Sequence, residues 1–513
     1  MSEPLILTFD CGTQSVRGLL FDKKGTLVGK SQISFEPYIA ERAGWAERHP
    51  DFYWEKLCQA SRMLKEQKGD RWGDIVAVTV TTMRDTAVLL DEQMNVVRPS
   101  ILWLDQRMAE CREPFPLFHR FCFHLAGMTD AATEQRKCTK ANWIRENQPE
   151  LWEKTRHYVL LSCYMTYKLT GRLVDSIANQ VGHIPFAYKK KRWMKKSNLK
   201  YRVFNIDREK LPPLVEPGEV IGELTEEAAR QTGLPKTLRL IATGSDKGCE
   251  TIGTGCIDES MGSLSFGTTS TIQLTTEKYV EPTRFLPAYP AVLSGKYNPE
   301  IEIYRGYWMI SWYKREFAAR EQTEAERAGI PVEALLNSKL SQIPPGSEGL
   351  VLQPYWGAGL KNPEAKGAII GFSDVHTRAH MYRAIIEGVN YALRDGLETV
   401  SRRAGIEVSV LTVSGGGSES DEICQITADM FGKKILRAQT FETSGLGSSM
   451  VGFVGAGEFA SIEEAVKSMV HHTSVFEPDM ERYREYTELF QNVYQQMYPR
   501  LKPLYKNIRK IYK

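Results

Sequence analysis

The sequence predicts an α/β protein built from two related domains that face each other across a cleft. Segments with the apolar pattern of strands alternate with segments that have the spacing of helices. The chain has 513 residues, which is too long for a single hydrophobic core. A pattern around Gly12 also returns around Gly267, almost half the chain length later. Internal similarity at that spacing indicates duplicated domains.

The first copy of this pattern lies between residues 5 and 21. An apolar run ends at Asp10, small residues follow, and a second apolar run begins at residue 18, which predicts two strands joined by a turn. Gly12 lets the backbone turn sharply, and exposed N–H groups beside the hydroxyls of Thr13 and Ser15 suit a phosphate chain. Asp10 offers a hard oxygen ligand for Mg²⁺. An ordinary glycine-containing hairpin explains this copy alone at least as well.

The second copy, at residues 262–274, makes a phosphate site the better interpretation. It repeats the order of apolar strand, Gly267-Thr268-Thr269-Ser270 and apolar strand. Two phosphate-binding hairpins across one cleft form a nucleotide-binding arrangement that differs from a P-loop. No Gly-x-x-x-x-Gly-Lys-Ser/Thr motif occurs in the chain, so a Walker-type site is excluded.

The composition argues against several other classes of protein. Apolar residues make up 42% of the chain and charged residues 25%, as in soluble globular proteins. A formal charge of +3 is too small to argue for nucleic-acid binding. The nine cysteines are scattered without a Cys-x-x-Cys pair, which predicts reduced thiols and no zinc site. Because neither a secretory signal nor a run of 18 apolar residues is visible, we expect a cytoplasmic protein without membrane spans.

The first half of the chain alternates strands and helices in order. After the first hairpin, Lys24-Gly25 predicts a turn before a third strand. Thr225 is expected to cap a short helix that Gly233 ends. The predicted strands are 26–35, 75–81, 86–91 and 238–242, and the predicted helices are 51–67, most of the stretch from about 108 to 170, and 226–232.

The second half continues the alternation after the repeated hairpin. A strand is predicted at 408–414, and helices are predicted at 380–402, 421–431 and 443–454 and from residue 480 onward. The helix 443–454 consists mainly of small residues, which suits close packing. In the first half, the strongly basic stretch from Lys189 to Lys200 lacks an apolar period and predicts a solvated loop rather than an anion-binding site.

Three groups of residues could carry chemistry. Asp246 follows a predicted strand and precedes a helix. A carboxylate there could accept a proton from an attacking hydroxyl or could cap the helix, and the local sequence favours the two roles equally. Arg84-Asp85 could bind vicinal hydroxyls, because arginine donates and aspartate accepts, or could be a surface ion pair. The glycines at 415–417 suit a nucleotide-contacting loop or a flexible turn.

Several longer motifs give the sequence a resemblance to a known family. The segment Asp10-x-Gly12-Thr13-x-Ser15-x-Arg17 is similar to the first phosphate motif of the FGGY carbohydrate kinases. The other matching segments are Gly44-Trp45-Ala-Glu47 with Trp54, Trp103-x-Asp105-x-Arg107, Lys140-Ala-Asn-Trp143-Ile-Arg-Glu146-Asn147, and Gly367-Ala-Ile-Ile-Gly371-Phe with His380-Met-Tyr-Arg-Ala384-Ile-Ile-Glu387. These motifs come in order, and the resemblance covers nearly the whole chain.

The resemblance implies a pair of actin-like, ribonuclease H-like domains with a deep cleft between them. Residues 1–257 would bind the sugar and supply the catalytic base, and residues 258–513 would bind the nucleotide. The implied reaction is phosphorylation of a hydroxyl of a small sugar or polyol by ATP with Mg²⁺. Asp246 would be the general base, Arg84 and Asp85 would bind the substrate with it, and Asp10 would associate with the metal. The implied ATP-binding residues are Gly12, Thr13, Ser15, Arg17, Gly267, Thr268, Thr269, Gly415, Gly416 and Gly417.

Three departures from the family pattern leave the substrate and the adenine contact open. The usual acidic-arginine segment before the second signature is reduced to Gly359-Leu-Lys361-Asn362-Pro363. Lys247 follows the expected base where glutamine or asparagine is usual, and we expect it to pair with Asp246 rather than to meet an acidic sugar. Glu419-Ser420-Asp421 replaces the usual asparagine or lysine after the glycines. The alternatives are a kinase for an autoinducer-2-like or acidic sugar, a non-catalytic nucleotide-binding sugar sensor, and an actin- or chaperone-like ATPase. The expected partner is a small sugar or polyol, not nucleic acid or membrane, with a homodimer as an option.

Overall fold

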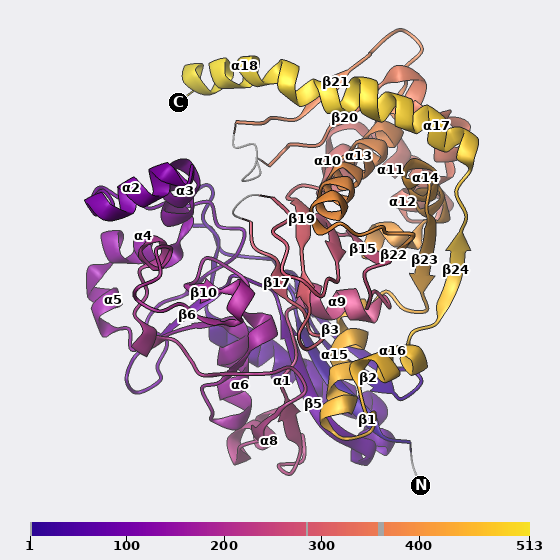
Figure 1. Ribbon diagram of the computed structural model, residues 1–513. Helices are drawn as coiled ribbons and strands as arrows, with labels where there is room; N and C mark the ends of the chain where they lie inside the picture. The colour runs from indigo at the N-terminus through magenta and orange to yellow at the C-terminus, as the bar shows by residue number, and fades with distance from the viewer. Residues whose placement is uncertain (1–2, 284–285, 358–363, 513) are drawn as a thin grey trace. The chain divides into compact units, whose positions relative to one another are not determined.

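The computed structural model describes residues 3–283, 286–357 and 364–512, which form two compact units (Figure 1). Unit 1 comprises Met1–Gly255, Ala288–Asn298 and Glu442–Val470, and unit 2 comprises Cys256–Pro287, Pro299–Phe441 and His471–Lys513. Unit 1 therefore takes two segments from beyond residue 257. The assignment of sugar binding to residues 1–257 and nucleotide binding to 258–513 stays a prediction.

Unit 1 is built on a six-stranded sheet that has the first hairpin at its centre. β1 pairs antiparallel with β2 and parallel with β5, and β5 pairs parallel with β14. The carboxyl ends of three neighbouring strands therefore meet at one edge of the sheet. In order across the sheet, the strands are β13 (Val220–Glu223), β14 (Arg239–Ile241), β5 (Ile75–Thr82), β1 (Leu5–Cys11), β2 (Ser15–Asp22) and β3 (Leu27–Ser34).

Unit 2 repeats this sheet. β15 pairs antiparallel with β16 and parallel with β22, and β22 pairs parallel with β23. The order across the sheet is β19 (Glu300–Ile303), β16 (Ser270–Leu274), β15 (Met261–Phe266), β22 (Val410–Ser414), β23 (Lys434–Ala438) and β24 (His472–Phe476). Because both sheets place a hairpin beside a parallel strand in the same way, the predicted duplication is confirmed.

Short strands and helices complete both units. The short strands are β4 (Glu47–Arg48), β6 (Ala87–Leu90), β7 (Ser100–Ile101), β8 (His157–Leu160), β9 (Asp175–Ser176), β10 (Phe186–Ala187), β11 (Arg192–Trp193), β12 (Leu214–Val215), β17 (Tyr289–Pro290), β18 (Tyr297–Asn298), β20 (Val351–Gln353) and β21 (Ala368–Ile370). The helices of unit 1 are α1 (Pro50–Lys68), α2 (Leu117–Leu125), α3 (Thr129–Cys138), α4 (Lys140–Asn147), α5 (Pro149–Lys154), α6 (Leu161–Thr170), α7 (Tyr201–Phe204), α8 (Glu226–Thr232), α9 (Asp246–Gly253), α15 (Thr443–Gly455) and α16 (Ile462–Met469). The helices of unit 2 are α10 (Trp308–Phe317), α11 (Ala319–Ala328), α12 (Val332–Ser338), α13 (Arg378–Ala404), α14 (Asp421–Phe431), α17 (Met480–Leu489) and α18 (Gln495–Ile511).

Most predicted elements lie within a few residues of the observed ones. The helix predicted at 421–431 is α14, and the side chain of Thr225 caps α8 by accepting a hydrogen bond from the Ala228 N–H at 3.1 Å. The stretch predicted to be mostly helical contains α2 to α6, interrupted by β8, whose short apolar run pairs with β6. The segment at 359–363 lies outside the described residues. One prediction was wrong in part. Within the predicted basic loop, β11 pairs with β10 because the Trp193 ring is buried against Phe186.

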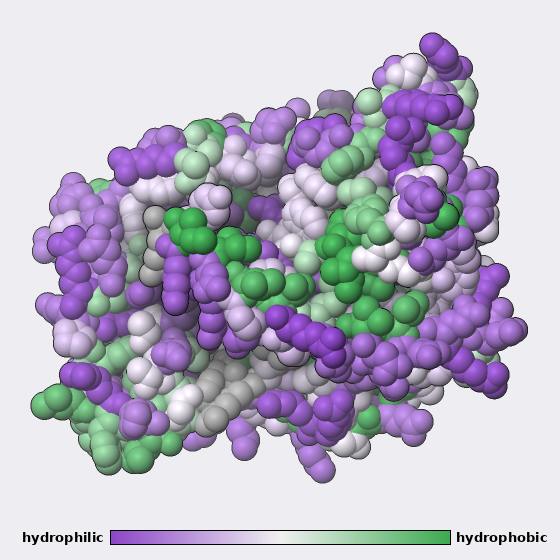
Figure 2. All heavy atoms as spheres, turned by 90° about the horizontal axis from the view of Figure 1, so that it is seen from above, coloured by the Kyte–Doolittle hydropathy of each residue, from purple (hydrophilic) through white to green (hydrophobic). Residues whose placement is uncertain are grey.

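The surface in Figure 2 is mainly polar, with an apolar group at its lower left, where α2 lies. The exposed side chains of this helix are Leu117, Phe118, Phe121 and Leu125, each more than half exposed. They add nothing to the core of unit 1. Among the described residues, no helix has both the length and the apolar character needed to cross a membrane.

Small residues let α9 and α15 approach closely in unit 1. A Cβ atom added at Gly253 would lie 1.9 Å from the Thr443 carbonyl oxygen, and one added at Gly447 would lie 1.9 Å from that of Cys249. α15 also packs on β1 and β5. The small-residue pattern at 443–454 therefore predicted close packing correctly, and this contact positions α9.

We expect Gly253→Ala to destabilise unit 1 by about 1–3 kcal/mol, because the added methyl group must push two helix backbones apart. Gly69→Ala is the matched control, since no atom lies within 4 Å of a Cβ added there and the residue has helical backbone angles. Urea denaturation of both variants measures the difference. Equal urea midpoints for the two variants would show that α9 and α15 can move apart to accept the methyl group without loss of stability.

Candidate functional site

The parallel strands of unit 1 bring three predicted site segments to one edge of the sheet. Asp10 lies at the end of β1, Arg84 follows β5, and Asp246 follows β14. These strands are neighbours, and the Thr81 hydroxyl donates a hydrogen bond to the Gly244 carbonyl oxygen at 3.0 Å. Residues that are far apart in the sequence thus form one polar cluster.

Asp246 is the first residue of α9, but it does not cap the helix. The cap is Ser245, whose hydroxyl accepts from the Gly248 N–H at 3.4 Å. The Asp246 carboxylate accepts from the Lys247 N–H at 2.8 Å and lies 4.0 Å from the Nε of Arg84. Burial raises the pKa of Asp246 above its usual value, although the positive charges of Arg84 and Lys247 act to lower it. Capping therefore does not explain this carboxylate.

Lys247 makes a different ion pair from the one predicted. Its Nζ lies 2.6 Å from Oε2 of Glu250, one helical turn along α9. The helix geometry explains this, because residues three apart lie on the same face whereas consecutive residues do not. Lys247 still acts on Asp246 through its backbone N–H and its charge.

Arg84 and Asp85 point to different partners. Arg84 lies near Asp246 and stacks over the Tyr289 ring at 5.6 Å. The Asp85 carboxylate accepts from the His183 N–H at 3.1 Å, contacts the His183 Nδ1 at 2.9 Å and pairs with the Nζ of Lys140 at 3.1 Å. Although burial acts to raise it, Lys140 and His183 hold the pKa of Asp85 well below its usual range. Asp85 is thus an ionised, well-anchored acceptor.

Asp10 is a buried carboxylate among other acids. Its Oδ2 pairs with Nη1 of Arg17 at 3.1 Å, and the same nitrogen lies 3.2 Å from Oε2 of Glu442. Burial raises the pKa of Asp10 to about 6, with further contributions from Asp246 and other acids and opposition from Arg17. A cation here would relieve this excess of negative charge, so the residues fit Mg²⁺. Among the described residues, no group of three or more acids, histidines and cysteines could hold a metal, so Asp10 would share the ion with water and phosphate.

The turn between β1 and β2 is fixed from inside unit 1. The Gly12 N–H donates to the Ser15 carbonyl oxygen at 3.0 Å, which closes the turn. The Thr13 hydroxyl accepts from Nε1 of Trp103 at 3.0 Å. Trp103 belongs to a motif whose Arg107 pairs with Asp105 at 2.7 Å. This motif therefore has a structural role next to the turn.

In unit 2, the corresponding turn and the glycine loop lie at the ends of neighbouring parallel strands. Gly267 and Thr268 follow β15, and the glycines at 415–417 follow β22. A Cβ atom at Gly417 would lie 2.5 Å from the Tyr307 ring, so only glycine fits there. Thr269 is buried and its hydroxyl donates to the Tyr304 carbonyl oxygen at 3.2 Å.

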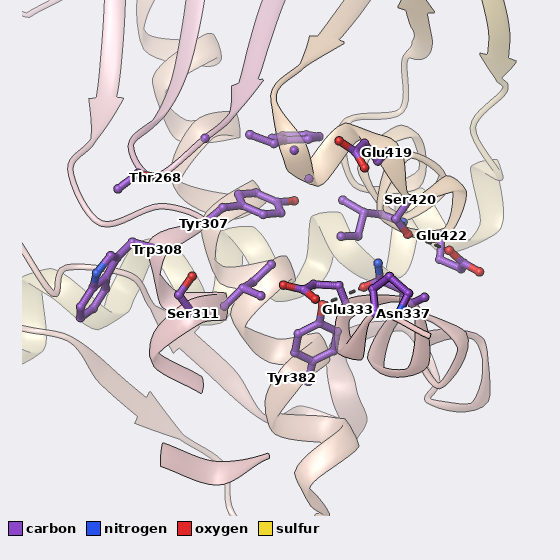
Figure 3. A pocket seen from close by; sticks show the side chains of 18 of the residues that line it. Thr268, Tyr307, Trp308, Ser311, Glu333, Asn337, Tyr382, Glu419, Ser420 and Glu422 are labelled. Atoms are coloured by element: carbon purple, nitrogen blue, oxygen red, sulfur yellow. Dashed lines mark hydrogen bonds between the residues drawn. The ribbon is translucent and has the colours of Figure 1, made fainter. Parts of the chain in front are cut away.

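These segments border a pocket of about 890 Å³ (Figure 3). Its residues come from both loops and from α10, α12, α13 and α14. They are Phe266, Gly267, Thr268, Tyr307, Trp308, Ile310, Ser311, Pro331, Glu333, Ala334, Asn337, Tyr382, Gly416, Gly417, Glu419, Ser420, Asp421, Glu422 and Ile423. Four predicted ATP-binding residues are among them, whereas Thr269 and Gly415 are not. The volume suits a nucleoside.

Sequence reasoning missed several residues of both sites. In unit 1 it gave no site role to Lys140, although that residue opens a family signature, and it overlooked His183 and Tyr289. In unit 2 it overlooked Tyr307 and Asn337. No local pattern marks His183, Tyr289 or Asn337, because their partners lie far away in the sequence.

Comparisons with known proteins show the family to which the chain belongs. The model of the N-terminal domain of the FGGY family of carbohydrate kinases matches residues 5–253, and that of its C-terminal domain matches residues 262–456. Xylulose kinase of Bacillus subtilis is 28% identical over 97% of each chain. Glycerol kinase of Thermococcus gammatolerans is 26% identical over 93% of this chain and 94% of its own.

Solved structures show the same fold. A ligand-bound xylulose kinase from Lactobacillus acidophilus superimposes with a TM-score of 0.83 at 21% identity, covering 98% of this chain and all of that one. A gluconate kinase from the same organism has a TM-score of 0.84 at 21% identity, covering 99% of this chain and all of that one. The two-domain actin-like α/β fold expected from the sequence is thereby confirmed. The chain belongs to the FGGY family of carbohydrate kinases and is an ATP-dependent carbohydrate kinase.

Proposed function

We propose that this kinase phosphorylates a hydroxyl of a small neutral ketose or polyol, with Asp246 as the general base. The supporting observation is the environment of Asp246, a buried carboxylate beside Arg84 that no helix cap explains. A base poised above the usual aspartate pKa and held near an arginine suits removal of a proton from an alcohol. Arg84, which lies beside Asp246, would donate to the sugar hydroxyls, and Asp85, the next residue in the chain after Arg84, would accept from them.

Phosphoryl transfer mainly requires positioning and neutralisation of charge. Gly12, Thr13, Ser15 and Arg17 would hold the phosphate chain from one hairpin. Gly267, Thr268 and Thr269 would hold it from the other. The adenosine would occupy the pocket beside the glycines at 415–417. Mg²⁺ near Asp10 would neutralise phosphate charge when bound, while Asp246 takes the hydroxyl proton.

A neutral substrate is favoured over an acidic sugar by the pairing of the cations in unit 1. Lys247 is paired with Glu250, and Lys140 is paired with Asp85. A sugar carboxylate would therefore have to compete with carboxylates already present. The curated relatives named xylulose kinase and glycerol kinase also suggest a ketose or polyol. We also propose that the enzyme is cytoplasmic. A homodimer is the oligomeric state to be tested.

ADP release from ATP, measured with a panel of ketopentoses, ketohexoses, pentitols, tetritols, glycerol and aldonates, tests this proposal. We expect turnover only with sugar present and faster with a neutral compound than with any aldonate. Fastest turnover with an aldonate would select the acidic-sugar alternative. Nucleotide binding without turnover on any compound would favour the sensor, and turnover without sugar would favour an ATPase.

Arg84→Met separates sugar binding from nucleotide binding. We expect the KM for sugar to rise at least ~10-fold, the usual effect of losing a charged hydrogen bond, with little change in the KM for ATP. Because the lost cation lowers the pKa of Asp246, that pKa should rise, and the acid limb of the rate profile should move to higher pH. Arg62→Met, on an exposed side chain that reaches the Gln231 carbonyl oxygen, is the control. Equal losses for sugar and ATP would contradict the placement.

A further inference from the structure

The pocket of unit 2 contains polar groups that the proposed function has not yet used. Tyr307 is 8% exposed and stacks on Phe266 at 4.9 Å, yet its hydroxyl has no hydrogen-bond partner among the described residues. Figure 3 shows this hydroxyl directed toward the side of the pocket from which Ser420 projects. A buried hydroxyl without a partner is costly, and a polar ligand in the pocket would satisfy it.

Asn337 offers a donor in the same pocket. The Tyr382 hydroxyl donates to Oδ1 of Asn337 at 2.7 Å, as the dashed line in Figure 3 shows. This contact orients the side chain so that the oxygen is used and the amide nitrogen is left to donate. The described residues place no acceptor on that nitrogen.

The acids of the pocket differ in how they are paired. Glu333 pairs with Lys314, and Asp421 pairs with Nη2 of Arg437 at 2.7 Å. A third acid, Glu422, accepts from the Ser420 hydroxyl at 2.7 Å. Among the described residues, nothing pairs with the carboxylate of Glu419, which lines the pocket and is exposed. Among the four acids, Glu419 is thus the carboxylate that remains for a ligand.

We infer that Glu419 recognises the nucleotide base by accepting a hydrogen bond from the exocyclic amine of adenine. It thereby discriminates against a base that has a carbonyl oxygen at that position. This inference rests on the proposed function of the pocket. Adenine offers an amine donor next to ring acceptors, which complements a carboxylate and the amide donor of Asn337. Hypoxanthine carries a carbonyl oxygen at this position instead of the amine. That oxygen and the carboxylate of Glu419 are both hydrogen-bond acceptors, so no hydrogen bond can form between them. The carboxylate of Glu419 therefore favours the binding of ATP over that of ITP.

The test compares MgATP with MgITP in the full-length wild type and in Glu419→Gln, together with ADP and IDP binding by calorimetry without sugar. We expect the wild type to prefer the adenine nucleotide by at least ~10-fold, because the hydrogen bond involves a charged group. In Glu419→Gln the preference should fall to about 3-fold or less, because an amide can donate to the carbonyl as well as accept from the amine. An unchanged preference would overturn the inference.

Two variants separate this effect from general changes in the pocket. Glu422→Gln removes the same charge from the same pocket, and it should change both nucleotides alike because Ser420 already uses that carboxylate. Tyr307→Phe keeps the ring and should weaken ADP and IDP equally, by about 3- to 10-fold, because a hydroxyl can donate or accept. If Glu419→Gln instead alters only the discrimination against 2′-deoxyATP, Glu419 contacts the ribose and the inference is wrong.

These readouts also separate the inference from the proposed function. ADP binding with the expected change in preference supports the inference even if no sugar in the panel is phosphorylated. Sugar-dependent turnover with an unaltered preference in Glu419→Gln supports the proposed function and overturns the inference. Absence of any ADP binding to the wild type would overturn both.

Discussion

Asp246→Asn is expected to lower sugar-dependent turnover at least ~10²-fold, the usual contribution of a positioned general base, while ADP binding stays near the wild-type value. The amide keeps the shape of the side chain and can still accept from the Lys247 N–H, but it cannot take a proton. Steady-state kinetics and calorimetry on the same preparation give both quantities. Turnover close to that of the wild type would remove Asp246 from the role of base.

The same variant should not lose stability, which distinguishes catalysis from folding. Because burial raises the pKa of Asp246 in the folded protein, its ionised form destabilises the fold at neutral pH, and the neutral amide removes that penalty. We expect a melting temperature equal to or above that of the wild type. The control is Asp22→Asn, in which an aspartate that accepts from the N–H groups of Lys24 and Thr26 is changed in the same way. It should leave turnover unchanged.

Glu387→Ala should give the largest loss of stability, about 3–5 kcal/mol in unit 2, because it leaves a buried arginine without its counter-ion. Glu387 and Arg383 lie on α13 at 2.7 Å, and both side chains are almost fully buried. Glu387 also accepts from the Tyr486 hydroxyl at 2.7 Å and from the Ser347 hydroxyl at 2.9 Å. The measurement is urea denaturation followed by far-ultraviolet circular dichroism.

Two comparisons interpret that loss. Glu227→Gln removes one partner of an exposed pair with Arg230 and should leave the urea midpoint close to that of the wild type, because water screens this pair. Replacing both Arg383 and Glu387 with methionine should destabilise unit 2 less than Glu387→Ala does, because no uncompensated charge remains. If the double variant is the weaker protein, hydrogen bonding to Tyr486 rather than charge pairing holds this region together.

The elements and the base candidate could be predicted from sequence because their signals are local. Asp246 follows an apolar strand and precedes small residues, and the glycines of both hairpins stand in short recurring patterns. The partners of Asp85 gave no such signal. Lys140 and His183 lie 55 and 98 residues away from it, and only the folded chain brings them together. The same reason hid Asn337, whose orientation depends on Tyr382, 45 residues away.

The pairing of Lys247 shows a second limit. Adjacency in the sequence suggested a bond with Asp246, but the helix directs the two side chains apart and places Glu250 within reach. Such outcomes depend on whether the residue after a strand already belongs to a helix. Because helix boundaries are the least certain part of a prediction from sequence, contacts between neighbours at a helix start are hard to foresee.

The inclusion of residues 442–470 in unit 1 has a consequence for biosynthesis. During translation, the strands of the first sheet emerge from the ribosome long before α15 does. Until then, the face of β1 and β5 that α15 covers in the folded protein remains exposed. Closure of so long a loop is slow compared with local pairing. The N-terminal half should therefore remain incompletely folded until α15 has been made, and it should not be obtained as a stable fragment on its own.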